Sequence, residues 1–234
     1  MINKPVMIIT GTRKGVGKYL AEYYVDKGFQ VIGCSREMID YELMNYKHYN
    51  IDVSDESSVK KMFIEIRKKY HRLDVLINNA GIASMNHILL TPLKEVQEIL
   101  NTNFIGAYLF CRESVKLMQK NKYGRIVNFS SIHIPLATVG TSIYGASKAA
   151  IEQFSKILAK EVFQFGINVN ILALSIVKDT GMGNVLTDEM KGKILNRSIS
   201  KSELNISDVT HTIDFFINEK STMITNQSVC LGGV

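Results

Sequence analysis

Short apolar segments alternate with longer amphipathic segments along the chain, and this alternation restricts the folds open to it. Five apolar segments predict buried strands, at 5–10, 30–34, 73–78, 125–130 and 167–174. Most of them are separated by periodic segments that predict helices, at 15–28, 56–70, 95–120 and 143–165. Repeated β-α units form a parallel sheet covered by helices on both faces. The pattern predicts an α/β fold with a doubly wound parallel sheet in three layers.

The chain is expected to form a single domain over residues 1–234. No linker, repeat or low-complexity tract interrupts the alternation, and three prolines are too few for a hinge segment. A hydrophobic content of 46% over 234 residues supports one substantial core.

Cysteine usage and charge indicate a cytoplasmic protein without a metal site. Cys34, Cys111 and Cys230 are odd in number, widely spaced and not in metal-ligand pairs, which suits reduced thiols. The apolar stretch near the first residue is too short for a signal sequence, and no apolar run approaches membrane-spanning length. The net charge of +6 comes from scattered lysines and arginines, so neither nucleic acid nor a membrane is the expected partner.

A glycine-rich turn follows the first predicted strand, in the sequence TGTRKGVGKYL. Such a strand-to-helix turn exposes backbone N–H groups at a helix N-terminus, where phosphate oxygens bind favourably. Gly11 permits the tight turn, Gly15 permits close approach of a ligand beside Val16, and Gly17 lets the helix pack near the strand. The spacing differs from the G-x-G-x-x-G fingerprint, so an ordinary strand-to-helix turn is the alternative interpretation.

The end of the second predicted strand bears on cofactor choice. In a Rossmann-type unit an acidic residue there binds the adenosine ribose of NAD, whereas an arginine accommodates the 2′-phosphate of NADP. This chain has Ser35 and Arg36 at that point, and Arg13 from the glycine turn can approach the same ribose. NADP(H) is therefore the expected cofactor, unless Arg36 is only a surface residue after a strand.

Tyr144 and Lys148 lie four residues apart in SIYGASKAAIEQF, with only small residues between them. On a helix they are neighbours on one face. A lysine ammonium would favour phenolate and lower the tyrosine pKa, which makes the phenol usable in proton transfer. The pair alone also fits a buried aromatic residue beside a solvated lysine.

Six motifs in order give the chain a resemblance to the short-chain dehydrogenase/reductase family. They are TGTRKGVG at 10–17, DV at 52–53, NNAG at 78–81, NTNFIG at 101–106, NFSS at 128–131 and YGASK at 144–148. The resemblance implies a catalytic tetrad of Asn103, Ser131, Tyr144 and Lys148. Tyr144 would be the general acid, Ser131 would polarise the carbonyl, Lys148 would bind the nicotinamide ribose, and Asn103 would hold a water that connects Lys148 to solvent.

The same resemblance implies further cofactor contacts. Asp52 and Val53 would border the adenine, and Asn79, Ala80 and Gly81 would line the cofactor channel. Asn79 could equally be structural, because an asparagine after a strand often ties neighbouring backbone together. Val177 and Thr180 would contact the nicotinamide carboxamide. The family usually has Pro-Gly after the sixth strand, whereas this chain has Leu174 and Ser175 there.

Within the family the chain most resembles 3-oxoacyl-carrier-protein reductases, which implies NADPH-dependent reduction of a ketone. Those enzymes often dock an acidic carrier protein on two arginines, of which Arg125 is present and the second position is Phe165. Alternatives are reduction of a free ketone, sugar or specialised metabolite, or a non-catalytic cofactor-binding subunit. The family also implies a homodimer or homotetramer.

Overall fold

A seven-stranded parallel sheet forms the centre of the protein, in the order β3-β2-β1-β4-β5-β6-β7. The computed structural model describes residues 4–180 and 186–234. The strands are β1 (Val6–Thr10), β2 (Gln30–Ser35), β3 (Tyr46–Asn50), β4 (Val75–Asn78), β5 (Gly124–Ser131), β6 (Ile167–Leu174) and β7 (Ser228–Cys230). Strand β1 pairs with both β2 and β4, so the direction of winding reverses there. Ligands bind at the carboxyl ends of the strands beside such a switch point.

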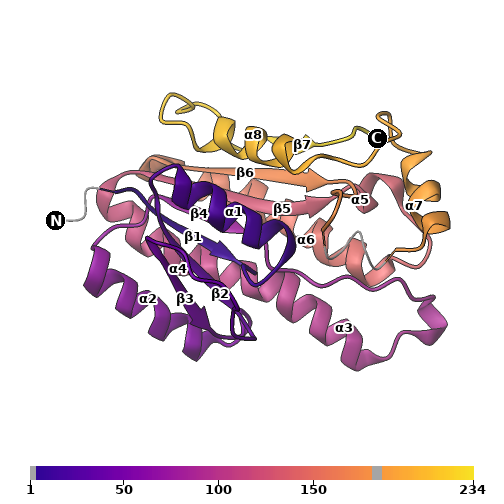
Figure 1. The fold of residues 1–234 in the computed structure, drawn as a ribbon, viewed down its shortest axis with the longest axis horizontal. Coiled ribbons are helices and arrows are strands. Elements are labelled where there is room, and N and C mark those ends of the chain that lie inside the picture. Colours follow the sequence, from indigo (N-terminus) through magenta and orange to yellow (C-terminus); the bar gives the residue numbers. More distant parts are fainter. Residues whose placement is uncertain (1–3, 181–185) are drawn as a thin grey trace.

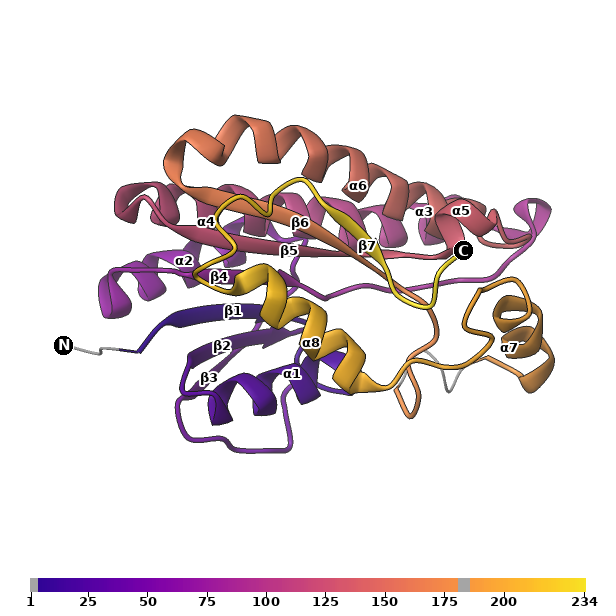
Figure 2. The same ribbon diagram turned by 90° about the horizontal axis from the view of Figure 1, so that it is seen from above.

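Helices cover both faces of the sheet (Figures 1 and 2). One face carries α1 (Gly15–Asp26) and α8 (Ile206–Ile217), and the other carries α2 (Glu56–Tyr70), α4 (Gly106–Asn121) and α6 (Ser142–Val162). Each layer has its own apolar core, with Leu20 and Phe216 in the first and Phe63 and Phe110 in the second. The remaining short elements are η1 (Ile88–Leu90), α3 (Leu93–Leu100), η2 (Asn101–Ile105), α5 (His133–Leu136), η3 (Phe163–Phe165) and α7 (Asp188–Leu195).

The predicted fold class is confirmed, and two strands were missed. Strand β3 has the polar sequence YKHYN and lies at the sheet edge, so it lacks the apolar run of a central strand. Strand β7 has only three residues. The segment predicted as one helix over 95–120 contains α3, the π-helix η2 and α4. No helix in residues 4–180 or 186–234 has the length and apolarity to cross a membrane.

Candidate active site

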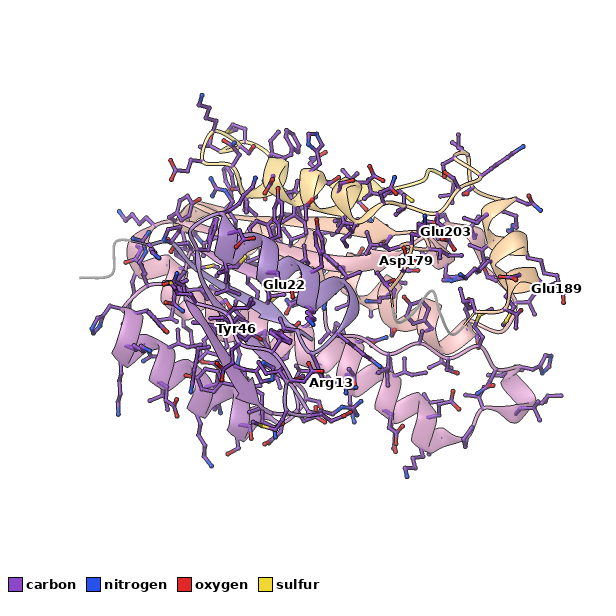
Figure 3. The ribbon with its side chains drawn as sticks, viewed as in Figure 1. Arg13, Glu22, Tyr46, Asp179, Glu189 and Glu203 are labelled. Atoms are coloured by element: carbon purple, nitrogen blue, oxygen red, sulfur yellow. The ribbon has the colours of Figure 1, made fainter. Side chains whose placement is uncertain are left out.

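The predicted site residues gather at the carboxyl ends of the central strands. Ser131 ends β5, Asn79 follows β4, Gly11 follows β1 and Ser35 ends β2. Because parallel strands end at the same edge, residues far apart in the sequence come together there. Arg13 also lies in this region, in the turn between β1 and α1 (Figure 3).

The glycine turn brings backbone very close to backbone. A Cβ atom on Gly17 would lie 2.1 Å from the Gly11 carbonyl oxygen and 2.5 Å from Asn79 Nδ2. Gly11 itself has φ +75°, which favours glycine. The helix that follows has no side-chain cap from Lys14 and no acidic residue in its first turn. Its N-terminus can therefore accept an anion.

Asn79 and Thr10 connect the glycine turn to β4. Asn79 Nδ2 donates to the carbonyl oxygens of Thr10 (2.8 Å) and Gly11 (3.1 Å). Thr10 Oγ1 in turn accepts from the backbone N–H groups of Asn79 (3.1 Å) and Ala80 (2.9 Å). The structural interpretation of Asn79 is thus supported, because its amide nitrogen is already engaged with backbone.

Ser35, Arg36 and Arg13 lie where the sequence predicts a ribose site, but two of their polar groups already have partners. Ser35 Oγ donates to the Glu37 carbonyl oxygen at 2.7 Å. Arg13 forms an exposed ion pair with the Glu37 carboxylate at 2.9 Å. Arg36 is exposed. An anion at this point would compete with Glu37 for Arg13.

Asp52 and Val53 follow β3 on the same side of the sheet. Asp52 Oδ1 accepts from Ser54 N (2.8 Å) and Ser54 Oγ (2.7 Å), which fixes the turn after the strand. Val53 is buried, and a Cβ on Gly106 would lie 2.7 Å from its Cγ2 atom. The glycine at the start of α4 therefore lets this helix pack against the turn.

Tyr144 and Lys148 share the buried face of α6, one turn apart. The Lys148 Nζ atom donates to the Phe129 carbonyl oxygen at 2.9 Å and lies 5.9 Å from the centre of the Tyr144 ring. Burial raises the pKa of Tyr144, and interaction with the Ser131 hydroxyl partly opposes this. Burial lowers the pKa of Lys148 to about 8. The expectation that the lysine lowers the tyrosine pKa is wrong for this structure, because desolvation of the phenol dominates.

Asn103 is held by the π-helix η2 and is buried. Its Oδ1 atom accepts from Ile82 N at 2.8 Å, and its Nδ2 atom donates to Ile82 O and Ser147 Oγ, both at 2.9 Å. A Cβ on Gly81 would lie 3.3 Å from Asn103 Oδ1 and 3.6 Å from Lys148 Nζ. The structure thus brings Asn103 and Lys148 to the same glycine, and the water-holding role that the resemblance implies for Asn103 stays a prediction. Ser147, which the sequence analysis did not single out, holds the amide in place.

This arrangement has clear relatives among known proteins. The sequence profile of the family described as short chain dehydrogenase matches residues 5–191. The chain belongs to the short-chain dehydrogenase family.

Curated relatives of the family extend over nearly the whole chain. The 3-oxoacyl-[acyl-carrier-protein] reductase FabG of Buchnera aphidicola (subsp. Schizaphis graminum) is 32% identical, covering 99% of this chain and 97% of its own. FabG of Salmonella typhimurium is 28% identical, covering 97% and 96%. Membership makes this protein an oxidoreductase that acts on CH–OH or C=O groups.

Solved structures agree with this assignment. The structure described as ElxO with NADP bound has a TM-score of 0.88 at 31% identity, covering 97% of both chains. A short chain dehydrogenase from Leptospira borgpetersenii with bound NAD⁺ has a TM-score of 0.89 at 22% identity, covering 98% of this chain and 92% of its own. At that identity the second likeness supports the fold alone.

The carboxamide contacts predicted from the short-chain dehydrogenase pattern lie on the loop after β6. Val177 and Thr180 are both buried there. Thr180 Oγ1 donates to the Val177 carbonyl oxygen at 2.8 Å. Their contact with a cofactor stays a prediction, and the hydroxyl of Thr180 already has an acceptor.

Arg125, the arginine that the resemblance assigns to carrier-protein docking, lies inside the protein. Only 3% of it is exposed, its guanidinium donates to the Gly124 carbonyl oxygen at 2.9 Å, and it stacks over the Tyr123 ring. An acidic partner on the surface cannot reach a guanidinium in this position. The other docking position, Phe165, is partly buried against α4 and α6.

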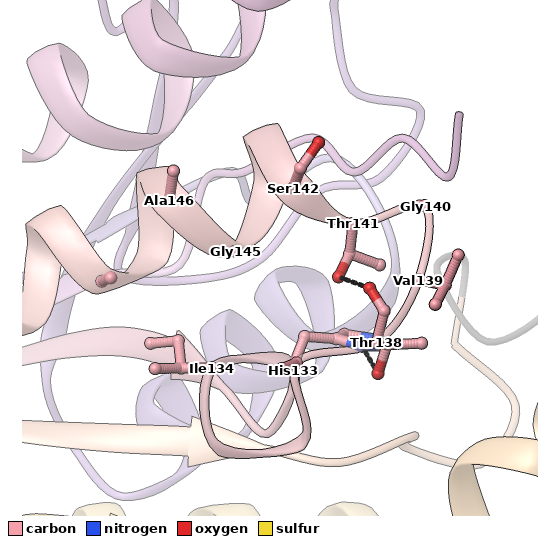
Figure 4. Close-up of a pocket in the computed structure, with 11 residues that line it drawn as sticks. His133, Ile134, Thr138, Val139, Gly140, Thr141, Ser142, Gly145 and Ala146 are labelled. Carbon is pink, nitrogen blue, oxygen red and sulfur yellow. Dashed lines mark hydrogen bonds between the residues drawn. The ribbon is translucent and has the colours of Figure 1, made fainter. Parts of the chain in front are cut away.

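A hollow of about 380 Å³ lies between the exposed face of α6 and the segment that precedes this helix (Figure 4). Gly145, Ala146 and Ala149 form its helical wall, and His133 and Thr138 come from the preceding segment. The His133 ring packs edge-to-face on the Tyr144 ring, with centroids 5.8 Å apart. His133 therefore touches the candidate active site from the side of this hollow. No cluster of His, Cys, Asp or Glu in the described parts of the chain is arranged to hold a metal ion.

Proposed function

We propose that this short-chain dehydrogenase reduces a ketone to a secondary alcohol with NADPH, and that a 3-oxoacyl thioester is its substrate class. The observation that carries the proposal is the burial of Tyr144 and Lys148 together, with the Ser131 hydroxyl in contact with Tyr144. The uncapped N-terminus of α1 follows the carboxyl end of β1 in the same sheet. Relatives named 3-oxoacyl-[acyl-carrier-protein] reductase support the substrate class. The structure described as ElxO with NADP bound supports the cofactor.

The residues at the carboxyl edge suit a dinucleotide. Gly11 shapes the turn, with its own N–H bonded to the Cys34 carbonyl oxygen, and the first turn of α1 at Gly15 and Gly17 would offer backbone N–H groups to a pyrophosphate. Arg13, Ser35 and Arg36 would surround the adenosine ribose and its 2′-phosphate. Asp52 and Val53 would border the adenine. When bound, NADPH supplies the hydride.

The protein side chains supply the proton and orient the carbonyl. Because burial raises the pKa of Tyr144, its hydroxyl is protonated at neutral pH and can donate to the carbonyl oxygen of a substrate. Ser131 Oγ would donate to the same oxygen and stabilise the charge that develops on it. Lys148 would hold the ribose hydroxyls. Asn103, fixed by Ile82 and Ser147, would order the polar groups that resupply the proton.

The docking of an acyl carrier protein is less well supported than the reduction of a ketone. Arg125 is buried, and Phe165 replaces the second arginine. These two positions favour a second candidate, a ketone that is not attached to a carrier protein. We therefore expect a small 3-oxoacyl thioester to be turned over about as efficiently as the same acyl group on acyl carrier protein. A free ketone should likewise be turned over without a carrier protein.

The substrate assignment can be tested by following NADPH absorbance with the purified protein. A 3-oxoacyl N-acetylcysteamine thioester, the same acyl group on acyl carrier protein, and a panel of free ketones and keto sugars would be compared. Turnover of the thioester supports the proposal, and turnover of only free ketones or sugars favours the second candidate. If no carbonyl is reduced although NADPH binds, the alternative of a non-catalytic subunit is supported.

We also propose a homo-oligomer that buries the outer faces of α4 and α6. A hollow of about 370 Å³ lies between these helices, lined in part by Tyr108, Phe154 and Phe165. Ile157, on α6, is 48% exposed. Large apolar side chains of this kind favour burial against a second copy. Light scattering after gel filtration should give at least a dimer mass, and Ile157→Glu should shift it toward the monomer.

A further inference from the structure

A continuous chain of hydrogen bonds runs from the glycine turn to the end of β2. Thr12 Oγ1 lies 2.7 Å from Tyr46 Oη, and Tyr46 Oη lies 2.8 Å from His48 Nδ1. His48 Nε2 lies 2.9 Å from Ser35 Oγ, which donates to the Glu37 carbonyl oxygen. The chain thus ends at the turn where Ser35 and Arg36 stand.

The proton positions in this chain follow from its last link. Ser35 uses its only proton on Glu37, so Ser35 Oγ must accept from His48 Nε2–H. In the neutral ring Nδ1 is then unprotonated and accepts from the Tyr46 hydroxyl. Desolvation holds the pKa of His48 below its usual value, so the ring is neutral at neutral pH in this structure.

The sheet register creates the space for this chain. His48 on β3 lies opposite Gly33 on β2. A Cβ atom on Gly33 would lie 2.0 Å from Tyr46 Oη and 2.3 Å from Thr12 Oγ1. Only glycine at this position leaves room for the hydroxyl groups to meet under the glycine turn.

We propose that His48 is a positioning residue for the adenosine 2′-phosphate: it holds Ser35 and, when protonated, strengthens binding of the phosphate. This inference rests on the proposed NADPH dependence. An imidazolium would keep its Nε2–H bond to Ser35 and donate through Nδ1 to Tyr46, whose hydroxyl can turn to Thr12. Its positive charge would then lie one hydroxyl away from the turn that receives the phosphate.

Other titratable and charged groups around His48 could also make ligand affinity depend on pH. Lys47, next to it on β3, opposes its protonation, and the Glu37 carbonyl oxygen favours it. Tyr46 and Tyr41 have raised pKa values, mainly because they are partly desolvated, and stay protonated in this range. The ligand phosphate itself has a second pKa near 6, so it loses charge in acid. The ligand phosphate titrates in the same way with a His48 variant as with wild type. The difference in affinity between the two proteins therefore reports the contribution of the His48 ring.

Calorimetric binding of 2′,5′-ADP and 5′-ADP tests this without reference to turnover. The proteins are wild type, His48→Gln, and His211→Gln, which removes an exposed histidine on α8. Near pH 6 we expect wild type to bind 2′,5′-ADP about tenfold more tightly than His48→Gln, with the gap narrowing to about threefold near pH 8. Binding of 5′-ADP should change less than about twofold, and His211→Gln should match wild type.

Three results would overturn the proposal. Equal weakening of both ligands in His48→Gln would show a general structural role. A gap that does not change with pH would show that protonation has no part. If wild type bound 2′,5′-ADP no better than 5′-ADP, the NADPH assignment would fail, and this inference would fail with it. The first two results would overturn only the role of His48 and leave the NADPH assignment in place.

Discussion

The Nζ atom of Lys148 lies 5.9 Å from the centre of the Tyr144 ring, and both side chains are buried on one face of α6. Burial acts on them in opposite directions. It raises the pKa of the phenol and lowers that of the amine to about 8, because desolvation disfavours the charged form of each group. The protein therefore keeps a protonated tyrosine as a donor at neutral pH, and carries the energetic cost of a buried lysine.

The first prediction is that Lys148→Met stabilises the protein without cofactor while it impairs function. A fall in the lysine pKa from 10.5 to about 8 corresponds to about 3 kcal/mol of destabilisation at neutral pH. Loss of the hydrogen bond from Lys148 to Phe129 O would offset about 1 kcal/mol of the stability gained in the variant. We expect the melting temperature near pH 7 to rise by roughly 4–8 °C, and cofactor affinity to fall.

The pH dependence gives this prediction its sign. Below about pH 8 both folded and unfolded lysine are protonated, so the cost is fully present. Between about pH 8 and 10.5 only the unfolded state holds the proton, and wild-type stability rises towards that of the variant. Lys156→Met, at an exposed lysine of the same helix, is the control and should show no such trend. A Lys148→Met protein that is less stable than wild type at every pH would contradict the account.

The second prediction concerns cofactor choice. Arg36, and Arg13 once it leaves Glu37, can form charge-assisted contacts with a 2′-phosphate worth roughly 1.5–3 kcal/mol each. We expect kcat/KM with NADPH to exceed that with NADH by at least about tenfold, and the preference to shrink as salt rises.

Ser35→Asp combined with Arg36→Ala tests the same contacts by removing them. The new carboxylate repels phosphate and can accept from a free ribose hydroxyl, so the preference should be erased or reversed. Equal use of NADH and NADPH by wild type at low salt would show that Arg36 is only a surface residue. The assignments of the glycine turn and of Tyr144 would survive that result.

The third prediction compares two helical glycines. Gly17→Ala places a Cβ atom 2.1 Å from the Gly11 carbonyl oxygen, so the turn must open. We expect a loss of stability of about 1–3 kcal/mol, and cofactor affinity reduced at least about tenfold. Gly145→Ala meets nothing within 4 Å, so it should stabilise the protein by up to about 1 kcal/mol. Denaturant unfolding of both variants measures the difference, and an equal effect of the two would contradict the packing argument.

Much of the fold was predictable because central parallel strands are continuous apolar runs. The segment 167–174, for example, was predicted with the bounds that β6 has. Edge strand β3 was not, because all of its residues are exposed or half-buried and include Lys47 and His48. The π-helix at Asn103 was missed for a different reason. Its register depends on Asn103 reaching Ile82, and such tertiary contacts leave no period in the sequence.

The sequence indicated which residues lie together at the candidate site, but not their pKa values, and the catalytic roles of these residues stay predictions. The order of the motifs predicted that Ser131, Tyr144 and Lys148 lie together at one edge of the sheet. In the structure Ser131 ends β5, and Tyr144 and Lys148 lie in the first turns of α6. Sequence spacing placed lysine beside tyrosine but carried no information on burial, which decides both pKa values. The engagement of Ser35 by His48 and the burial of Arg125 likewise depend on strand register and packing.

The fourth prediction is that Tyr144→Phe removes the proton donor and leaves the fold intact. Turnover should fall by at least about 10²–10⁴-fold, which is typical of a lost general acid. The cofactor affinity and the melting temperature should stay close to wild type, because the hydroxyl is a small part of the buried side chain. Turnover above about half that of wild type, measured when chemistry limits the rate, would remove Tyr144 from the reaction.

The central claim is hydride transfer from NADPH to a carbonyl carbon, with Tyr144 as the proton donor. Single-turnover reactions with NADPH carrying deuterium at the transferring position of C4, analysed by mass spectrometry of the alcohol, test it most directly. We expect one deuterium on the carbinol carbon of the product from wild type, and little product of any kind from Tyr144→Phe in the same time. An alcohol without deuterium, or equal rates of deuterated product from the two proteins, would contradict it.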